Sequence, residues 1–498
     1  MAVNSGRAGS DVDDRCDVVV VGSGPNGLAA AVVMARAGLE VRVFEAQDSI
    51  GGGARTLDLG TVPGLVHDLC SAVHPMAAMS PFFRAFDLPS RVELRYPDVS
   101  YAQPLDGGRA GIAYRDMERT VAGLGPDGTA WHRLMRPLVE RIDGIVDTAM
   151  FDRRSIPSAP IAGMLFGRAT LEQGSPLWNI RWRADVAPAM LTGVAAHSIS
   201  TLPRLAAAGA ATLLASLAHA PGWPLPVGGS QAITDALVSD LTRHGGTVTA
   251  GIEVSDLAQL PPAHAYLLDV TPRALLRIAG NRLPHRYARA LSRFPHGNGA
   301  TKVDFALSGP VPWEHPDVGR AGTVHVGGSR SEMVEAEDAV AAGRHAERPM
   351  ILASDPVLLD PSREVGGVRP LWTYAHVPAG STVDIGDTVQ AQIERFAPGF
   401  GDLVVARNVI TAAELPRHNA NYVDGDIAAG VVTLWRMLAR PSARWDPYST
   451  PLPGVYLCSA STPPGPGVHG MAGLHAARRA LRDRFGIREI PQLGPNSP

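Results

Sequence analysis

Residues 17–56 constrain the fold more than any other stretch, because they read as strand, glycine turn, helix, strand and acid in that order. The first strand, 17–21, is almost entirely valine, which is typical of a strand covered on both faces in a parallel sheet. Ala-rich residues 26–37 predict a helix that Gly38 ends, and residues 40–44 predict the second strand. This order indicates the dinucleotide-binding half of an α/β fold.

The glycines of the first turn have the G-x-G-x-x-G spacing. The first permits a tight turn, the second lets a diphosphate approach the backbone, and the third lets the helix pack close to the strand. The helix points its free N–H groups and the positive end of its dipole at the same place. An acid ends the second strand, where its carboxylate can accept hydrogen bonds from the adenosine ribose. This part of the predicted cofactor site consists of Gly22, Ser23, Gly24, Pro25, Asn26, Gly27, Glu45 and Ala46.

A second glycine-rich turn follows, with a cation beside it, and such a turn can wrap the far side of a diphosphate and a ribityl chain. It consists of Gly51, Gly52, Gly53, Ala54, Arg55 and Thr56. At this point the sequence resembles the flavin-dependent family of phytoene desaturases, monoamine oxidases and their relatives, in which a glycine pair follows the acid. The resemblance implies that the cofactor is FAD.

Composition and charge narrow the class of protein. The chain has 498 residues, more than one ordinary core holds, and its net charge of −3 offers no basic surface for nucleic acid. The three cysteines have neither metal-ligand nor redox-pair spacing, so we expect no metal site and a reducing, cytoplasmic setting. Residues 1–15 are polar and predict a disordered tail without a secretory signal.

Residues 205–218 are mostly Ala and Leu but are too few to cross a bilayer. They predict a buried or partly buried helix. A peripheral membrane contact that admits an apolar substrate is the other interpretation.

Further along the chain, strands and helices alternate again. We expect strands 247–250 and 265–270 to rejoin the nucleotide sheet, and Ser230 to cap a helix over 232–241. Strands at 303–307, 350–354 and 371–377 and an acidic surface helix at 331–343 predict the sheet part of a second domain.

The predicted fold class is α/β: a discontinuous Rossmann-type FAD-binding domain with an inserted α+β substrate domain, similar to phytoene desaturases and amine oxidases. The FAD-binding segments are residues 16–95, 226–300 and 446–486; the substrate domain has a mainly helical part, 96–225, and a sheet part, 301–445; residues 487–498 form a tail. A split of this kind places the active site at the seam between the domains.

Residues 459–481 repeat the turn-then-helix pattern, but no acidic strand follows them. In the families that this chain resembles, a similar segment runs beside the isoalloxazine ring and points a helix N-terminus at its pyrimidine edge. This arrangement would stabilise the negative charge of a reduced flavin. The resemblance implies ring contacts from Gly467, Val468, His469, Gly470 and Met471, and further cofactor contacts from Val254 and Ser461.

The resemblance covers most of the chain. The runs GLVHDLCSAVHP at 64–75, GWPLPVGGSQAITDAL at 222–237 and YLCSASTPPGPGVHGM at 456–471 are similar to the bacterial branch of phytoene desaturase-like oxidoreductases. This branch also resembles an animal family named for pyridine nucleotide-disulfide oxidoreductases. The present chain, however, has no active-site cysteine pair and no second nucleotide motif.

Hydride transfer from carbon to flavin N5 needs few catalytic side chains, because the cofactor supplies the reactivity. The companion proton could pass to His67, Asp68, His74 or His469. For His67 and His74, a packed or helix-capping role is as open as a catalytic one. For His469 we favour a cofactor contact over proton transfer.

Two further features have both a functional and a structural interpretation. Lys302 could hold a water or an electron-rich group near N5, or it could be a surface or salt-bridged lysine. Trp372, Tyr374 and His376 share one face of a predicted strand, either as a pocket wall or, as we favour, in core packing.

The sequence therefore predicts an FAD-dependent oxidoreductase that oxidises, desaturates or isomerises an apolar substrate such as a polyene or an isoprenoid. One alternative is a flavin amine oxidase acting on a small amine. Another is a non-catalytic scaffold or regulatory protein that FAD stabilises. Oxygen and quinone both remain possible electron acceptors.

Overall fold

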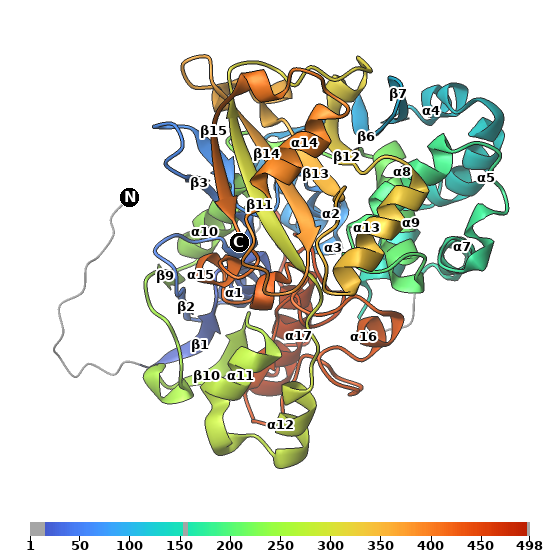
Figure 1. Ribbon diagram of the computed structural model, residues 1–498. Helices are drawn as coiled ribbons and strands as arrows, with labels where there is room; N and C mark the ends of the chain where they lie inside the picture. The colour runs from blue at the N-terminus through green and yellow to red at the C-terminus, as the bar shows by residue number, and fades with distance from the viewer. Residues whose placement is uncertain (1–14, 153–157, 496–498) are drawn as a thin grey trace.

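The computed structural model describes residues 15–152 and 158–495, which form two large sheets and the helices around them (Figure 1). The first is a five-stranded parallel sheet in the order β16-β10-β1-β2-β9. The second is a seven-stranded mixed sheet in the order β15-β11-β14-β13-β12-β6-β7. The predicted tail at 1–15 lies outside the described residues except for Arg15.

The strands of the parallel sheet are β1 (Cys16–Val21), β2 (Val41–Phe44), β9 (Thr247–Thr249), β10 (Ala263–Leu268) and β16 (Val455–Leu457). Those of the mixed sheet are β6 (Val99–Leu105), β7 (Arg109–Tyr114), β11 (Gly299–Leu307), β12 (Ala321–Val326), β13 (Ile351–Ser354), β14 (Arg369–Val377) and β15 (Val404–Ile410). Two small antiparallel pairs are β3 (Thr56–Asp58) with β4 (Val66–Asp68), and β5 (Leu94–Arg95) with β8 (Leu225–Pro226).

The helices near the cofactor part are α1 (Pro25–Arg36), α2 (Pro75–Met79), α3 (Pro81–Phe86), α10 (Gln231–Arg243), α11 (Pro272–Ala279), α12 (His285–Ser292) and α17 (Met471–Phe485). On one side of the molecule lie α4 (Met117–Gly123), α5 (Gly128–Val139), α6 (Ile142–Met150), α7 (Pro160–Gln173), α8 (Val186–Ala196) and α9 (Leu205–His219) (Figure 1). The rest are α13 (Arg330–Ala341), α14 (Gly386–Glu394), α15 (Leu415–His418) and α16 (Leu434–Leu438).

The opening and closing parts of the chain lie side by side. Helix α1 begins with a proline at its first turn, where no N–H is needed, and ends before Gly38, which has a φ of +80°. It packs against α17 so closely that a Cβ atom on Gly473 would lie 2.0 Å from the carbonyl oxygen of Asn26. Because β16 also pairs with β10, the last strand and the last helix complete the fold that the first residues begin.

The strands predicted at 17–21, 40–44, 247–250 and 265–270 all belong to the parallel sheet, so the expectation that the last two rejoin it is confirmed. The expectation of a mainly helical stretch after residue 96 omitted β6 and β7. Pro104 lies inside β6, and a proline within a run argues against a strand. β6 nevertheless pairs with β12 on one side and β7 on the other.

Two local predictions need correction. Ser230 lies at the N-cap position of α10, but its hydroxyl contacts Ser71 and His74 instead of capping the helix. The acidic helix at 331–343 is not wholly a surface helix, because Glu337 of α13 is buried and shares a hydrogen bond with His376. Burying a carboxylate costs free energy unless it has a partner, and the His376 imidazole is that partner.

Candidate functional site

The first glycine turn follows β1 at the carboxyl end of the parallel sheet. Gly22 has a φ of +96°, and a Cβ atom on Gly27 would lie 2.2 Å from the carbonyl oxygen of Gly22. Both glycines therefore have the steric roles that their spacing predicts. Gly24 is different, because its backbone is extended and the atom nearest to an added Cβ would be a side-chain oxygen of Asp269, at 2.7 Å.

Glu45 lies at the end of β2 in a fixed orientation. Its Oε2 accepts hydrogen bonds from the backbone N–H of Ser23 at 2.8 Å and from the Ser23 hydroxyl at 2.6 Å. Its Oε1 accepts one from the N–H of Gln47 at 2.9 Å. Glu45 and Ala46 line the large cavity described below, so this carboxylate is held at the place where a ribose is expected.

Sequence reasoning missed Asp269, which follows β10 directly. It is buried, and its Oδ2 accepts a hydrogen bond from the N–H of Gly27 at 2.9 Å, at the first turn of α1. Burial, with a smaller contribution from the negative charge of Glu45, raises the pKa of Asp269 to about 7, against the effect of the Gly27 hydrogen bond. An acid directly after a strand that rejoins the nucleotide sheet was the signal that could have identified it.

The second glycine turn lies over the first. A Cβ atom on Gly52 would be 2.8 Å from the Cα atom of Gly24, and one on Gly53 would be 2.1 Å from the Tyr422 hydroxyl. Gly52 and Gly53 line the cavity, whereas the side chains of the residues around them face the protein. The neighbours that do not line it are Gly51, Ala54, Arg55 and Thr56.

Arg55 holds this turn in place. Its guanidinium donates to Gly52 O at 2.9 Å, to Ser49 Oγ at 2.9 Å and to His418 O, and burial lowers its pKa. The predicted role of Arg55 was to lie beside a diphosphate. Its contacts link the turn to His418, the last residue of α15.

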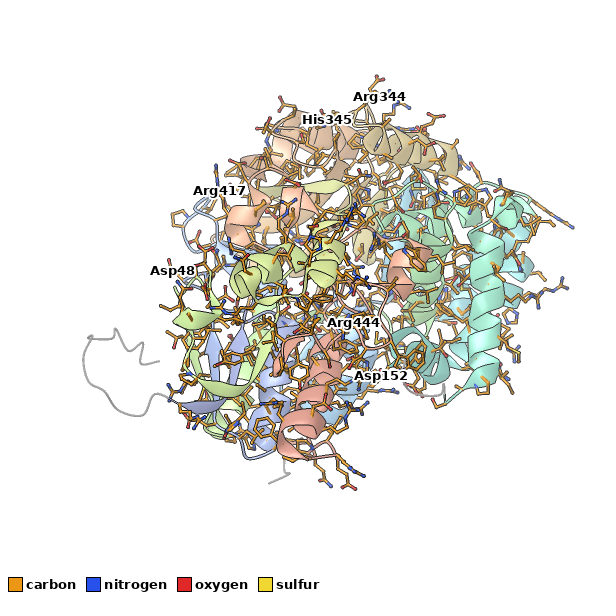
Figure 2. The ribbon with its side chains drawn as sticks, turned by 90° about the horizontal axis from the view of Figure 1, so that it is seen from below. Asp48, Asp152, Arg344, His345, Arg417 and Arg444 are labelled. Carbon is orange, nitrogen blue, oxygen red and sulfur yellow. The ribbon has the colours of Figure 1, made fainter. Side chains whose placement is uncertain are left out.

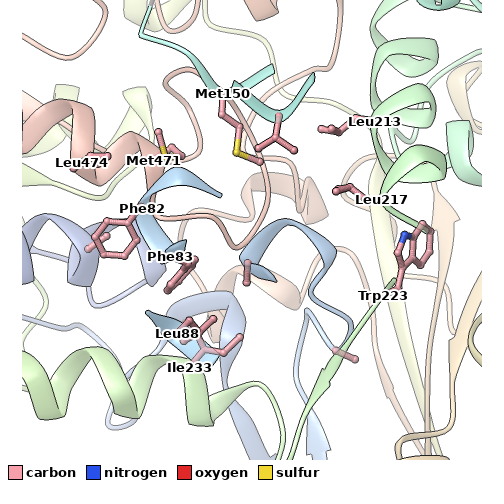
Figure 3. Packing of buried hydrophobic residues seen from close by; sticks show 14 of the residues in the cluster. Phe82, Phe83, Leu88, Met150, Leu213, Leu217, Trp223, Ile233, Met471 and Leu474 are labelled. Atoms are coloured by element: carbon pink, nitrogen blue, oxygen red, sulfur yellow. The ribbon is translucent and has the colours of Figure 1, made fainter. Parts of the chain in front are cut away.

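The carboxyl-terminal loop brings Gly467 and Val468 to the cavity and buries the residues that follow. His469 Nδ1 accepts the N–H of Met471 at 3.0 Å, so Nε2 carries the proton and donates to Gly465 O at 3.1 Å. Since both ring nitrogens are engaged, His469 acts as a cap for α17. Figure 3 shows the start of α17, with Met471 and Leu474, packed beside Phe82 and Phe83.

Val254 lines the cavity. The other predicted contacts, Gly470, Met471 and Ser461, are buried and do not line it. A Cβ atom on Gly470 would be 2.4 Å from the Phe82 ring, and the Ser461 hydroxyl donates to Ala429 O at 2.7 Å. The first turn contributes Gly22, Gly24, Pro25 and Asn26 to the lining, but not Ser23 or Gly27.

The cavity has a volume of about 860 Å³ and extends between the two sheets and the helices α7 and α9. At one end it is lined by Gly24, Glu45 and Asp269 of the parallel sheet. At the other end it is an apolar chamber, whose walls include Phe166, Leu213, Trp223, Leu352, Trp372 and Tyr374. In Figure 2 the nucleotide side, marked by Asp48, lies at the left and the helical side at the right.

The chamber differs from the nucleotide end in charge. Among the described residues that line the cavity, the acids are Glu45, Glu253 and Asp269, and all of them lie at the nucleotide end. The chamber end therefore has polar groups but no carboxylate. Two of these polar groups are Thr323, whose Oγ1 is buried without a hydrogen-bond partner in the described structure, and His197.

The candidate proton acceptors do not gather in the chamber. His74 lines the cavity, donates to Ser230 at 2.8 Å, and has its pKa lowered to about 4 by burial. His67 lies on β4 outside the lining, and burial, with the charge of Lys302, lowers its pKa to about 3. The Asp68 carboxylate already accepts hydrogen bonds from Arg363, Thr56 and Ser230. These groups are weak bases at neutral pH.

Lys302 is buried on β11 and pairs with Asp304 on the same strand. Its Nζ also lies 5.0 Å from the centre of the Trp372 ring. Of the interpretations that the sequence left open, the structure shows the salt-bridged lysine, and the side chain is not among those that line the cavity.

Trp372 and Tyr374 form part of the chamber wall, with their rings 5.3 Å apart at an angle of 82°. Both rings are also buried members of the larger hydrophobic core, so the pocket-wall and the core-packing interpretations hold together for these two residues. Core packing alone holds for His376, which faces Glu337 away from the cavity. Alternation along β14 correctly places all three on one face, but it does not show where that face meets empty space.

Comparisons with known proteins agree with this geometry. The model of the NAD(P)-binding Rossmann-like domain matches residues 20–87. Pyridine nucleotide-disulfide oxidoreductase domain-containing protein 2 of Rattus norvegicus is 25% identical and covers 97% of this chain and 96% of its own. Hydroxyneurosporene desaturase of Rhodobacter capsulatus is 26% identical and covers 94% of this chain and 98% of its own.

Among solved structures, a triple mutant of putrescine oxidase superposes with a TM-score of 0.58 at 17% identity, covering 95% of this chain and 99% of its own. At 17% identity this structural similarity supports the fold alone. The two sequence relatives, which match nearly the whole chain, support an oxidoreductase enzyme. The chain therefore resembles the Rossmann-like, FAD-dependent oxidoreductases, and its relatives over nearly the whole length include pyridine nucleotide-disulfide oxidoreductase domain-containing protein 2 and hydroxyneurosporene desaturase.

Proposed function

We propose that this chain binds FAD non-covalently and oxidises, desaturates or isomerises an uncharged, apolar substrate such as a polyene or an isoprenoid. The observation that supports this most is one continuous cavity, which leads from the glycine turn past Gly52 and Gly467 to an apolar chamber. A nucleotide at one end and an apolar molecule at the other would meet in its middle.

The residues present fit a dinucleotide. The backbone at Gly24 and Gly52 carries no side chain into the cavity, so a diphosphate can approach it. Asn26 Oδ1 and His74 Nδ1 are buried at the lining and have no hydrogen-bond partner within the described part of the chain. Such buried polar atoms are costly unless a bound group satisfies them.

The roles of the residues follow from their positions. The first turn and α1 would hold the diphosphate, Glu45 the ribose, and Gly467 with Val468 the edge of the ring. When bound, FAD supplies the hydride acceptor. The chamber walls orient the substrate and exclude water, and the electron acceptor, oxygen or a quinone, would use the same route.

The charge of the chamber supports an uncharged substrate over an amine. A protonated amine taken out of water needs a carboxylate partner, and the acids among the described lining residues lie at the nucleotide end. The amine oxidase alternative keeps one supporting observation. Trp372 and Tyr374 form an aromatic wall, and the faces of aromatic rings attract a cationic amine.

Anaerobic reduction of the flavin separates the two functions. Purified protein loaded with FAD is mixed with polyenes or isoprenoids in one series and with small amines in the other, and the absorbance of oxidised flavin is followed. We expect bleaching with the apolar compounds and none with amines. Bleaching by amines alone would contradict the proposed substrate class, and re-oxidation with oxygen or a quinone then identifies the acceptor.

We also propose that this enzyme is cytoplasmic and touches a membrane at its periphery. No helix among the described residues is long and apolar enough to span a bilayer. The apolar rim, which we define as Ile161, Met164 and Leu171 of α7 with Leu434, Trp435 and Leu438 of α16, is nevertheless exposed. The same two helices line the chamber through Phe166 and Leu434, so the rim adjoins the route of an apolar substrate.

Removing two large side chains from the rim tests this contact. The double variant Trp435→Ser/Leu438→Ser should bind lipid vesicles at least about tenfold more weakly, since each side chain contributes on the order of 1.5 kcal/mol or more when buried. Co-sedimentation with phosphatidylcholine vesicles measures the effect. Val405→Ser, an exposed valine on β15, is the matched control and should bind as wild type does. Equal binding by all three proteins would contradict the proposed contact.

A further inference from the structure

We propose that Asp269 is a further residue of the dinucleotide site, and that it takes up a proton when the diphosphate binds. The inference rests on the proposed binding of FAD. It concerns a residue that the glycine spacing and the acid after β2 do not reveal, because Asp269 comes from a separate segment of the chain.

The carboxylate of Asp269 lies over the glycine turn. Its Oδ2 accepts the N–H of Gly27 at 2.9 Å and would be 2.7 Å from a Cβ atom on Gly24. It therefore faces the backbone that the G-x-G-x-x-G spacing leaves bare for a diphosphate. An ionised carboxylate at this position would repel the phosphate groups, and it already uses one donor of the helix N-terminus.

Hydrogen bonds of its own main chain hold Asp269 in this position. Its N–H donates to Val21 O at 2.8 Å, and its carbonyl oxygen accepts the Asn421 side-chain amide at 2.9 Å. A Cβ atom on Gly22 would lie 2.9 Å from the same carbonyl oxygen. With the main chain held on both sides, the carboxylate can move away from a ligand only by rotating its own side chain, which breaks the hydrogen bond from Gly27.

Among the residues that the structure describes, no cation pairs with Asp269 to keep it ionised. Of the groups around it, Glu45 at the end of β2 is acidic, and burial raises the pKa of the Cys458 thiol after β16 well above its usual value, so that it is neutral. Arg277 of α11 pairs with Glu253 at 3.1 Å, and Arg55 is bound to backbone carbonyls. Burial raises the pKa of Asp269 to about 7, so both forms are available near neutral pH.

A protonated carboxyl resolves the conflict with the diphosphate. One of its oxygens still accepts the N–H of Gly27, while the other carries the proton and can donate it in a hydrogen bond to a phosphate oxygen. The proton comes from solvent, and no bond to the cofactor forms. Binding should therefore be favoured on the acidic side of the Asp269 pKa and weaken as pH rises above it.

The test is a titration of FAD binding against pH, followed by quenching of flavin fluorescence. For the wild type, we expect the dissociation constant to be nearly constant below pH 7 and to rise by up to about tenfold per pH unit above it. Asp269→Asn keeps an acceptor for Gly27 and a donor for phosphate without a charge, so its dissociation constant should be independent of pH. Asp48→Asn, at an exposed acid that does not line the cavity, is the control and should follow the wild type.

Calorimetry at pH 8 in two buffers of different ionisation enthalpy counts the protons directly. We expect the wild type to take up close to one proton for each FAD bound, and Asp269→Asn to take up none. Binding without proton uptake, or the same pH dependence in both proteins, would overturn the role of Asp269 while leaving FAD as the cofactor. If neither protein binds FAD at any pH, the proposed cofactor itself is wrong and the inference falls with it.

Discussion

Gly24→Val is expected to give a folded protein that no longer binds FAD. Gly24 has an extended backbone with φ −64° and ψ 167°, which valine adopts readily, so the main chain should keep its shape. An added Cβ atom meets only the far end of the Asp269 side chain, at 2.7 Å. The fold can move that carboxylate, but a diphosphate cannot pass a valine at this point.

The expected loss of affinity is about a hundredfold to ten-thousandfold, because a blocked diphosphate loses two or so charge-assisted hydrogen bonds of about 1.5–3 kcal/mol each. The purified variant should be colourless, while its circular dichroism matches that of the wild type stripped of FAD. The FAD affinity of Gly24→Ala should lie between that of the wild type and that of Gly24→Val.

Gly123→Val is a suitable control, since an added Cβ at that position meets no atom within 4 Å. It should remain yellow. Gly27→Val would be uninformative, because its Cβ atom would lie 2.2 Å from a backbone oxygen and the variant would misfold. A yellow, fully loaded Gly24→Val protein would show that the diphosphate lies elsewhere.

The nucleotide half of the fold could be predicted from the sequence because its determinants are local. A valine run, a glycine spacing and an Ala-rich helix each specify their own backbone, and β1, α1 and β2 follow one another without interruption. The strands β9 and β10 were placed in the same sheet for the same reason, since each follows a clear helix or turn.

Several strands of the mixed sheet could not be predicted in this way. Pro104 argued against a strand at 99–105, yet two neighbouring strands supply enough pairing to hold β6 in place. β12 and β15 were also missed, although each pairs within the same sheet. Tertiary pairing, which no local window contains, decides these elements.

The candidate site likewise contains features that depend on local sequence and features that depend on distant residues. The roles of Gly22 and Gly27 depend on their neighbours in sequence, whereas Asp269 reaches the glycine turn from more than two hundred residues away. Arg55 likewise reaches a distant carbonyl, that of His418, whereas His469 contacts its near neighbours Gly465 and Met471 at the start of α17. Residue type and spacing therefore predicted the backbone of the glycine turn that lines the cavity, but not which side chains reach it.

Lys302→Met is expected to destabilise the protein by about 3–5 kcal/mol, because it leaves the buried Asp304 without its ion-pair partner. Chemical denaturation at pH 8 measures this loss. Adding Asp304→Asn removes the uncompensated charge and should restore most of the stability. If Lys302→Met alone were as stable as the wild type, the ion pair would not support the fold.

The loss should also depend on pH. Burial raises the pKa of Asp304 to about 6, against the effect of Lys302, so the folded state holds this proton more tightly than the unfolded chain does. Stability is therefore lost as pH rises from about 4, and without Lys302 the loss continues above pH 6. The destabilisation by Lys302→Met should shrink in acid, where the carboxyl is neutral in both states.

The double variant also decides between a structural and a catalytic role for the lysine. Burial, and after it the charge of Lys302, lowers the pKa of His67, whose Nδ1 lies 3.7 Å from Asp304, so the three groups form one buried cluster outside the cavity lining. If that cluster only supports the sheet, the rate of flavin reduction should recover together with stability in Lys302→Met/Asp304→Asn. A stable double variant that stays slow would show that Lys302 acts on the reaction itself.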